Sequence, residues 1–288
     1  MGELMASLDT AQPASDHSTP LSHDEILGPH PEDHHVFGEW LSCNDGVCQT
    51  GNTLHRALME NGVRSGSVCK EISHWLATHH LSAQRLASLK RRAEIYQKYG
   101  LPAPPLAGAG VVPKADKVRK GNLAEIMLAK YCCVCANADL PVYRLHYSTN
   151  VNQSMPGDDV LAFDLDSEPV RVIVGEAKFR ATPSKVVVKE TVNSLCRSYR
   201  DAVPLSINFV ADRLREQGKS DLADRVDECY VLCESRQARV DYVGLLVSNC
   251  NCAANVARHG ESDLHRLLMV SLSLSDPVGF ADECWDGV

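Results

Sequence analysis

The chain has 288 residues, of which 44% are hydrophobic and 23% are charged, so it can bury the core of one large domain or of two smaller ones. Only 6% of the residues are aromatic, which argues against a stacking platform for single-stranded nucleic acid. The formal net charge of −8 also opposes a nucleic-acid partner, provided that the charge is spread evenly along the chain.

The negative charge is instead concentrated near the N-terminus. Residues 1–39 contain eight acidic residues and no Lys or Arg, which leaves 29 acidic and 29 basic residues in the rest of the chain. Residues 85–130 carry ten Lys and Arg against three acidic residues, and residues 170–200 carry seven against two. Such basic segments can contact phosphate in a protein of negative net charge, although solvated helix faces explain them equally well.

The N-terminal segment is predicted to be a disordered acidic tail that covers residues 1–38. Pro, Ser, Asp and His dominate it, and without hydrophobic periodicity it cannot bury enough apolar surface to offset the entropy lost on ordering. It has neither the basic nor the apolar segment of a secretion signal, and no apolar stretch in the chain approaches ~18 residues. We therefore expect a cytoplasmic protein without a membrane span.

The twelve cysteines are expected to be free thiols, because the predicted compartment is reducing. They cluster at 132–135, 229–233 and 250–252, but the repeated C-x-x-C pairs of a structural zinc site are not present. Cysteine is commonly a small buried apolar residue, and we favour that interpretation over zinc binding.

Residues 39–105 are predicted to form a helical region. One helix face is indicated by Leu54, Leu58 and Met59. Two further helices are indicated by spaced apolar residues, namely Ile72, Leu76, Leu81, Leu86, Leu89 and Ile95. Ser82 is a candidate N-cap for the second of them. The Pro- and Gly-rich stretch 101–113 then ends the periodicity, which predicts a linker and a separate domain at 106–288.

The second domain is predicted to be α/β, because helical and strand-like segments alternate along it. The expected helices are 118–135, 184–201 and 206–233, and the expected strands are 142–146, 160–165, 171–175, 241–247 and 267–274.

The strongest functional signal lies at 172–178, where the sequence is VIVGEAK. The β-branched run predicts a buried strand, and the two-residue period of a strand puts Glu176 and Lys178 on the same face. A carboxylate can hold a hard cation such as Mg²⁺, and a nearby ammonium can orient the attacking water and offset phosphorane charge. Taken alone, the tripeptide Glu176-Ala177-Lys178 leaves an exposed charge pair open as the alternative.

Two aspartates upstream, Asp158 and Asp159, open a second short strand directly after a Pro-Gly turn. If this strand forms a hairpin with 171–175, Asp159 converges on Glu176 and a metal site follows. A further carboxylate, Glu125, lies among apolar neighbours on the helix 118–135, where burial without a partner is costly. Metal coordination is one such partner, and a surface position on the helix is the alternative.

These segments, in this order, resemble the PD-(D/E)xK nuclease superfamily, whose restriction-endonuclease-like αβββαβ core matches the elements expected from 118 to 247. More narrowly, the segments 121–128, 154–159 and 175–178 resemble the HamA family, the nuclease subunits of the Hachiman anti-phage defence system.

The resemblance implies an Mg²⁺-dependent DNA endonuclease, with Mn²⁺ as an alternative metal, that is controlled by a partner helicase. It implies that Asp159, Glu176 and Glu125 are metal ligands and that Lys178 is the catalytic lysine. Asp158 is the alternative to Asp159 as ligand. The helical region 40–100 would be the docking surface for the helicase.

Two other functions are compatible with the same sequence. A non-catalytic DNA-binding or regulatory subunit would keep the fold without the chemistry, although all of the expected catalytic side chains are present. A stand-alone repair nuclease would carry its own DNA-binding groove, and the neutral charge of residues 40–288 favours reliance on a partner instead.

Overall fold

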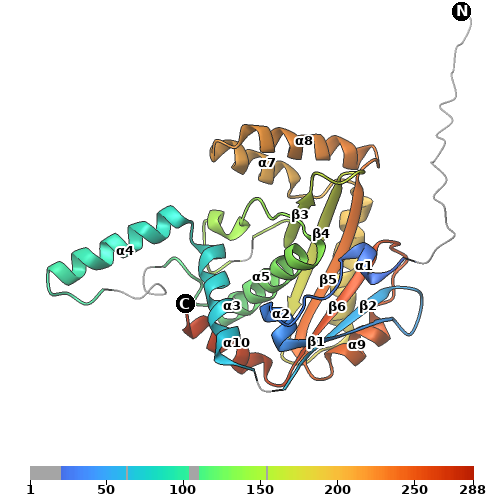
Figure 1. The fold of residues 1–288 in the computed structure, drawn as a ribbon, viewed down its shortest axis with the longest axis horizontal. Coiled ribbons are helices and arrows are strands. Elements are labelled where there is room, and N and C mark those ends of the chain that lie inside the picture. Colours follow the sequence, from blue (N-terminus) through green and yellow to red (C-terminus); the bar gives the residue numbers. More distant parts are fainter. Residues whose placement is uncertain (1–20, 63, 104–109, 154) are drawn as a thin grey trace, which may run out of the picture.

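The computed structural model describes residues 21–62, 64–103, 110–153 and 155–288. A six-stranded sheet in the order β1-β2-β6-β5-β4-β3 lies at its centre (Figure 1). The four inner strands are parallel to one another, and the two edge strands are antiparallel to their neighbours. The strands are β1 (Leu41–Val47), β2 (Leu54–Glu60), β3 (Val160–Asp164), β4 (Arg171–Phe179), β5 (Arg239–Asn249) and β6 (Leu267–Leu274).

Helices pack against both faces of the sheet and produce a three-layer α/β/α arrangement. One face is covered by α1 (His23–Ile26), α2 (Val36–Trp40), α3 (Gly66–His80), α5 (Asp116–Ala136) and α10 (Pro277–Asp286). The other face is covered by α6 (Lys185–Arg200), α7 (Ile207–Glu216), α8 (Ser220–Glu234) and α9 (Cys252–His259). Helix α4 (Ala83–Lys98) projects from the body and has no buried residue (Figure 1).

Strand burial explains the apolar sequences that form this sheet. Every residue of β6 is buried, as expected for a parallel strand with helices on both sides. In β4, Ile173 faces the core beneath α5, whereas Val172 and Val174 face the core beneath α6.

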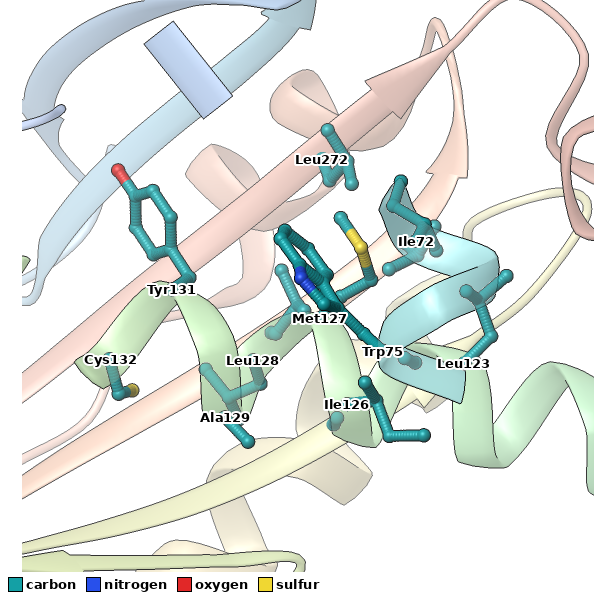
Figure 2. Close-up of a cluster of buried hydrophobic side chains, with 14 of the residues drawn as sticks. Ile72, Trp75, Leu123, Ile126, Met127, Leu128, Ala129, Tyr131, Cys132 and Leu272 are labelled. Atoms are coloured by element: carbon teal, nitrogen blue, oxygen red, sulfur yellow. The ribbon is translucent and has the colours of Figure 1, made fainter. Parts of the chain in front are cut away.

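Helix α5 is the main helix of the first layer. Its residues Leu123, Ile126 and Leu128 are fully buried, and they form part of a cluster with Ile72 and Trp75 of α3 (Figure 2). A helix that is apolar around most of its circumference belongs in the interior of a protein. The predicted helices at 118–135 and 184–201 and the strand at 267–274 are confirmed within the usual error at element ends.

The predicted helix face formed by Leu54, Leu58 and Met59 is wrong, because these residues belong to β2. A spacing of four residues fits a strand face as well as a helix face, so Leu54 and Leu58 did not discriminate between the two. Met59 lies on the opposite face of β2 and is 43% exposed. The two helices predicted after it are confirmed, and Ser82 caps the second by accepting a hydrogen bond from the Arg85 N–H.

The predicted disordered tail is wrong over residues 21–38, while residues 1–20 lie outside the described part of the chain. Helix α1 and the beginning of α2 fall in this segment, and its apolar residues join the core. Arg56 of β2 fixes the segment, because its buried guanidinium donates to the Gly28 carbonyl (2.8 Å) and to Asp24 (3.3 Å). One of the acidic residues that suggested a solvated tail, Asp24, is therefore a partner of a buried arginine.

The predicted strand at 142–146 is also wrong. In its place the chain forms a 3-10 helix at Arg144–Tyr147, and an isolated bridge joins Asp139 to Phe163. Pro141 has no N–H to donate to a strand ladder, and the Arg144 side chain contacts the carboxylates of Glu125 and Asp159. In the described chain, two strands and not three therefore lie between α5 and α6.

The predicted 206–233 helix is interrupted at Gly218, which has a φ of +74° and separates α7 from α8. Eight of the twelve cysteines are buried and behave as small apolar side chains. Within the described ranges, no helix combines the length and the hydropathy that a membrane crossing requires. The predicted linker 101–113 includes residues 104–109, which lie outside those ranges.

Gly175 allows α5 to approach β4 just before Glu176. A Cβ atom at this position would lie 2.8 Å from both Leu128 Cδ2 and Val160 Cβ, closer than packed carbon atoms approach. Gly175→Ala should therefore lower the free energy of unfolding by about 1–3 kcal/mol, which is the usual range for overpacking. Urea denaturation at equilibrium measures this change.

Gly46→Ala is the matched control, since a Cβ at Gly46 in β1 meets nothing within 4 Å. Its unfolding free energy should equal or exceed that of the wild type. Equal stability of Gly175→Ala and Gly46→Ala would contradict the close packing of α5 on β4.

Candidate functional site

The sheet brings three of the predicted site residues to one end of strands β3 and β4. The predicted hairpin is confirmed, because β3 and β4 are antiparallel and Val160 pairs with Gly175. Asp159, which precedes β3, therefore lies beside Glu176, and its Oδ2 accepts a hydrogen bond from the Ala177 N–H (3.0 Å). Lys178 contacts Glu176 directly, as expected for alternate residues on one strand face.

These side chains line a cavity of about 670 Å³. Glu125 enters it from α5, so all four predicted catalytic residues share one space. Basic side chains stand around the carboxylates, with Lys117 and Lys120 on α5 and Arg180 just after β4. The lining of the cavity thus combines four carboxylates, including Asp116, with five basic side chains.

Asp158 and Asp159 point in different directions. The Asp158 carboxylate accepts hydrogen bonds from Ser198 Oγ (3.1 Å) and from the Ser206 N–H (3.0 Å), so it joins β3 to the layer of α6 and α7. Asp159 faces the 670 Å³ cavity, whose lining includes Asp159 and not Asp158. The geometry therefore favours Asp159 in the predicted ligand position and gives Asp158 a structural role.

Arg144 is the site residue that sequence reasoning missed. Its guanidinium donates two hydrogen bonds to Glu125 (2.7 and 2.9 Å), one to Asp159 Oδ1 (3.0 Å) and one to the Asp158 carbonyl (2.8 Å). The Arg144 side chain is only 13% exposed. Burial lowers the pKa of Arg144, but the carboxylates of Glu125, Asp159 and Glu176 together more than offset this effect, so the pKa is raised and the guanidinium stays charged.

Of the two members of this ion pair, the sequence pattern indicated Glu125 but not Arg144. The apolar surroundings of Glu125 correctly indicated a buried carboxylate that needs a partner. Nothing in the local pattern around Arg144 identified it as that partner, because it lay within a segment predicted to be a strand. Only the fold brings these two side chains together.

Two carboxyl groups in the cavity hold protons more tightly than usual. Burial raises the pKa of Glu125 to about 7, although Arg144 acts in the opposite direction. Burial and the neighbouring Asp159 raise the pKa of Glu176, and Lys178 opposes them. Carboxylates that are crowded in this way are favourable places for a cation to bind.

A divalent ion would be held mainly by Asp159 and Glu176. Among the residues that the structure describes, no group of three or more His, Cys, Asp or Glu side chains is arranged to hold a metal ion. Mg²⁺ does not need such a group, because it keeps several waters and is often bound by one or two carboxylates. Both Glu125 oxygens accept hydrogen bonds from Arg144, and both Asp159 oxygens accept one each, from Arg144 and from the Ala177 N–H. The ligand roles of Glu125 and Asp159 therefore stay predictions.

The raised pKa of Glu125 gives a pH-dependent contribution to stability. The folded protein binds this proton more tightly than the unfolded chain, whose pKa is near the ordinary value of 4.5. The resulting stabilisation is complete below pH 4.5 and is lost as the pH rises through about 7. The unfolding free energy of the wild type should therefore fall relative to Glu125→Gln between these values, by on the order of 1.4 kcal/mol per pH unit.

Urea denaturation at several pH values between 5 and 8, about the range in which folded proteins are most stable, measures the difference. Glu234→Gln, which removes an exposed carboxylate at the end of α8, is the control. A difference between wild type and Glu125→Gln that is constant with pH would contradict the raised pKa.

Comparison with known proteins adds evidence that is independent of this geometry. The sequence model of the HamA family matches residues 34–283. The chain is also 32% identical over 263 residues to the Hachiman protein HamA of Bacillus cereus, and the match covers 91% of this chain and 94% of that protein. Both matches include Glu125, Arg144, Asp159, Glu176 and Lys178 within the long region that they cover. The chain therefore belongs to the HamA family.

Proposed function

We propose that this protein is a metal-dependent DNA nuclease that acts in anti-phage defence, on a PD-(D/E)xK type of site. The observation that carries the proposal is the convergence of Glu125, Asp159, Glu176 and Lys178 on one cavity. The carboxylates come from two neighbouring strand ends and a buried helix, which are rigid supports for a catalytic site.

The side chains divide the chemical tasks among them. Asp159 and Glu176 supply hard oxygen donors for Mg²⁺ or Mn²⁺. When bound, the divalent ion supplies Lewis-acid polarisation of the scissile phosphate and lowers the pKa of a water. Lys178 lies beside Glu176, where its ammonium can orient the attacking water and balance charge on the phosphorane. Arg144 holds Asp159 and Glu125 in place through its ion pairs with both carboxylates.

DNA is the substrate that the charge distribution favours. Lys117, Lys120 and Arg180 line the same cavity as the carboxylates, where they are suited to contact phosphate oxygens flanking the scissile bond. Lys120 also pairs with Asp116, which lines the cavity too. Helix α4 carries a basic run, Lys90–Arg92, that is solvent-accessible because α4 has no buried residue. These groups allow local phosphate contacts in a chain whose net charge is −8.

The defence role rests on family membership, since the chain is a homologue of a Hachiman protein. Control by a partner helicase is part of the proposal. The projecting helix α4 and the residues after it are candidates for docking, because Ile95, Tyr99 and Leu101 are at least 50% exposed.

A second candidate function is a non-catalytic DNA-binding subunit on the same fold. The observation that favours it is the closed set of ion pairs, in which Arg144 satisfies Glu125 and part of Asp159, and Lys178 contacts Glu176. In such a subunit these pairs would be permanent. In a nuclease, the contacts to Asp159 and Glu176 must open or rearrange when a metal ion binds.

Cleavage of plasmid DNA with Mg²⁺ tests the nuclease, alone and with a co-encoded helicase. Glu176→Ala and Lys178→Ala should each reduce cleavage by about 10²-fold or more, because each removes a group that acts on the transition state. Glu216→Gln and Lys219→Met, which alter exposed side chains at the α7–α8 connection, are matched controls and should cut like the wild type. Wild-type protein that is folded but cuts under neither condition would favour the binding subunit.

Direct metal binding gives a test that does not depend on turnover. We expect calorimetry to detect Mn²⁺ binding to the wild type and at least about tenfold weaker binding to Asp159→Asn, which loses one anionic oxygen donor. Asp164→Asn, at the other end of β3, is the control and should bind like the wild type. Equal Mn²⁺ affinity of Asp159→Asn and the wild type would contradict a ligand role for Asp159.

A further inference from the structure

A second cavity, of about 380 Å³, lies at the opposite end of the sheet from the carboxylates. Strands β4 and β5 are parallel, and Arg171 at the start of β4 pairs with Arg239 at the start of β5. The proposed catalytic residues lie near the end of β4, where Lys178 pairs with Leu246. Arg239 and Arg266, which precedes β6, line the second cavity. It is therefore separate from the proposed nuclease site.

A single buried carboxylate anchors the arginines at this end. Asp241 has 0% exposure and accepts hydrogen bonds from the Nε atoms of Arg171 (2.7 Å), Arg239 (3.1 Å) and Arg266 (2.5 Å). The Arg171 guanidinium also donates to the Ile26 carbonyl (2.6 Å) and is buried. Arg239 and Arg266 remain 31% and 26% exposed, so both reach from Asp241 to the cavity.

Positive charge is in surplus here. Arg236, at the end of the α8–β5 connection, adds a further guanidinium to the cavity lining. None of the described residues that line this cavity is acidic. Three arginines line the cavity, and the two carboxylates that interact with Arg239 and Arg266, those of Asp241 and the exposed Glu25, lie outside its lining. In a protein of net charge −8, such a surplus favours an anionic ligand.

The wall of the cavity is aromatic. Tyr199 is 43% exposed, and it packs edge-on against the buried ring of Tyr242 with the ring centroids 6.0 Å apart. The Arg236 guanidinium lies over the Tyr199 ring, 5.5 Å from its centroid, and donates a hydrogen bond to the Tyr199 hydroxyl (3.4 Å). Tyr199 thus has a rigid support behind it and a cation over its ring. The part of this ring that stays exposed, next to arginines, is suited to contact a planar base that carries a phosphate.

Two helix ends shape the lining of this cavity. Among the described residues, three non-glycine positions have a left-handed φ, and two of them, Ala202 (φ 62°) and Arg236 (φ 55°), line this cavity. Each directly follows the C-cap residue of a helix, Asp201 of α6 or Ser235 of α8, where a left-handed residue commonly ends a helix.

We propose that this cavity binds a nucleotide, with the phosphate on Arg239 and Arg266 and the base against Tyr199. Guanidinium groups bind phosphate through paired N–H donors, and the Nε bonds to Asp241 hold these two in fixed orientations. The volume of about 380 Å³ falls within the range of small-molecule sites. The same chemistry can come from a free nucleotide or from the terminal nucleotide of a strand. The proposal does not depend on the proposed nuclease activity.

Calorimetric titration of the full chain with AMP tests this site, with EDTA present so that no metal-dependent reaction occurs. AMP should bind at least about tenfold more tightly than adenosine, which lacks the phosphate, and than ribose 5-phosphate, which lacks the base. A 5′-phosphorylated trinucleotide separates the two sources: tighter binding than AMP assigns the site to a strand end, and weaker binding assigns it to a free nucleotide.

Arg239→Ala and Arg236→Ala should each weaken AMP binding by about tenfold, because each removes a cation from the lining. Arg236 has no hydrogen bond to Asp241 among those described, so its removal tests the cavity without disturbing the buried anchor. Arg225→Ala, an exposed arginine on α8 that pairs with Asp166, is the matched control. Lys178→Ala should also bind AMP normally, which separates this site from the nuclease site.

Thermal unfolding of each variant verifies that it is folded. Absence of AMP binding at millimolar concentration would overturn the proposal. Unchanged AMP affinity in both Arg236→Ala and Arg239→Ala would overturn it as well. Equal binding of ribose 5-phosphate and AMP would mean that the base gains nothing from Tyr199, and it would overturn the assignment of the cavity to a nucleotide.

Discussion

The guanidinium of Arg144 is held inside the protein by the carboxylates of Glu125 and Asp159, and the proposed catalytic cavity depends on this contact. Removal of one partner from a buried ion pair leaves an uncompensated charge, which typically costs about 3–5 kcal/mol. The pairing therefore ties together α5, the 3-10 helix and the start of β3, which are distant in sequence. It also sets the charge that any bound metal ion or phosphate would encounter.

Sequence reasoning succeeded where local pattern and burial agree. The strand at 171–175, its hairpin with β3 and the long helix α5 each follow from apolar runs that the sheet and its helices bury. The convergence of Glu125, Asp159, Glu176 and Lys178 followed from the same elements and from a family resemblance, and the structure places them in one cavity. Their catalytic roles remain predictions.

Sequence reasoning failed where a side chain acts over a long distance in the sequence. Arg56 binds the segment 21–38 through hydrogen bonds to Asp24 and to the Gly28 carbonyl, and no local sequence pattern predicts such a contact. Leu54 and Leu58 fit a helix or a strand equally well until β6 is known to lie beside them. Arg144 was not predicted as a site residue because its segment carries strand-like residues. Pro141 and the contacts of Arg144 with Glu125 and Asp159 favour a 3-10 helix there instead.

The position of β6 has a consequence for how the chain reaches its folded form during synthesis. This strand, at residues 267–274, is inserted between β2 and β5 and is the link between strands made early and strands made later. A nascent chain still missing these residues has two unjoined sheet fragments with open edges. The centre of the sheet can close only after residues 267–274 have been synthesised, so a product truncated before them would leave exposed strand edges that invite aggregation.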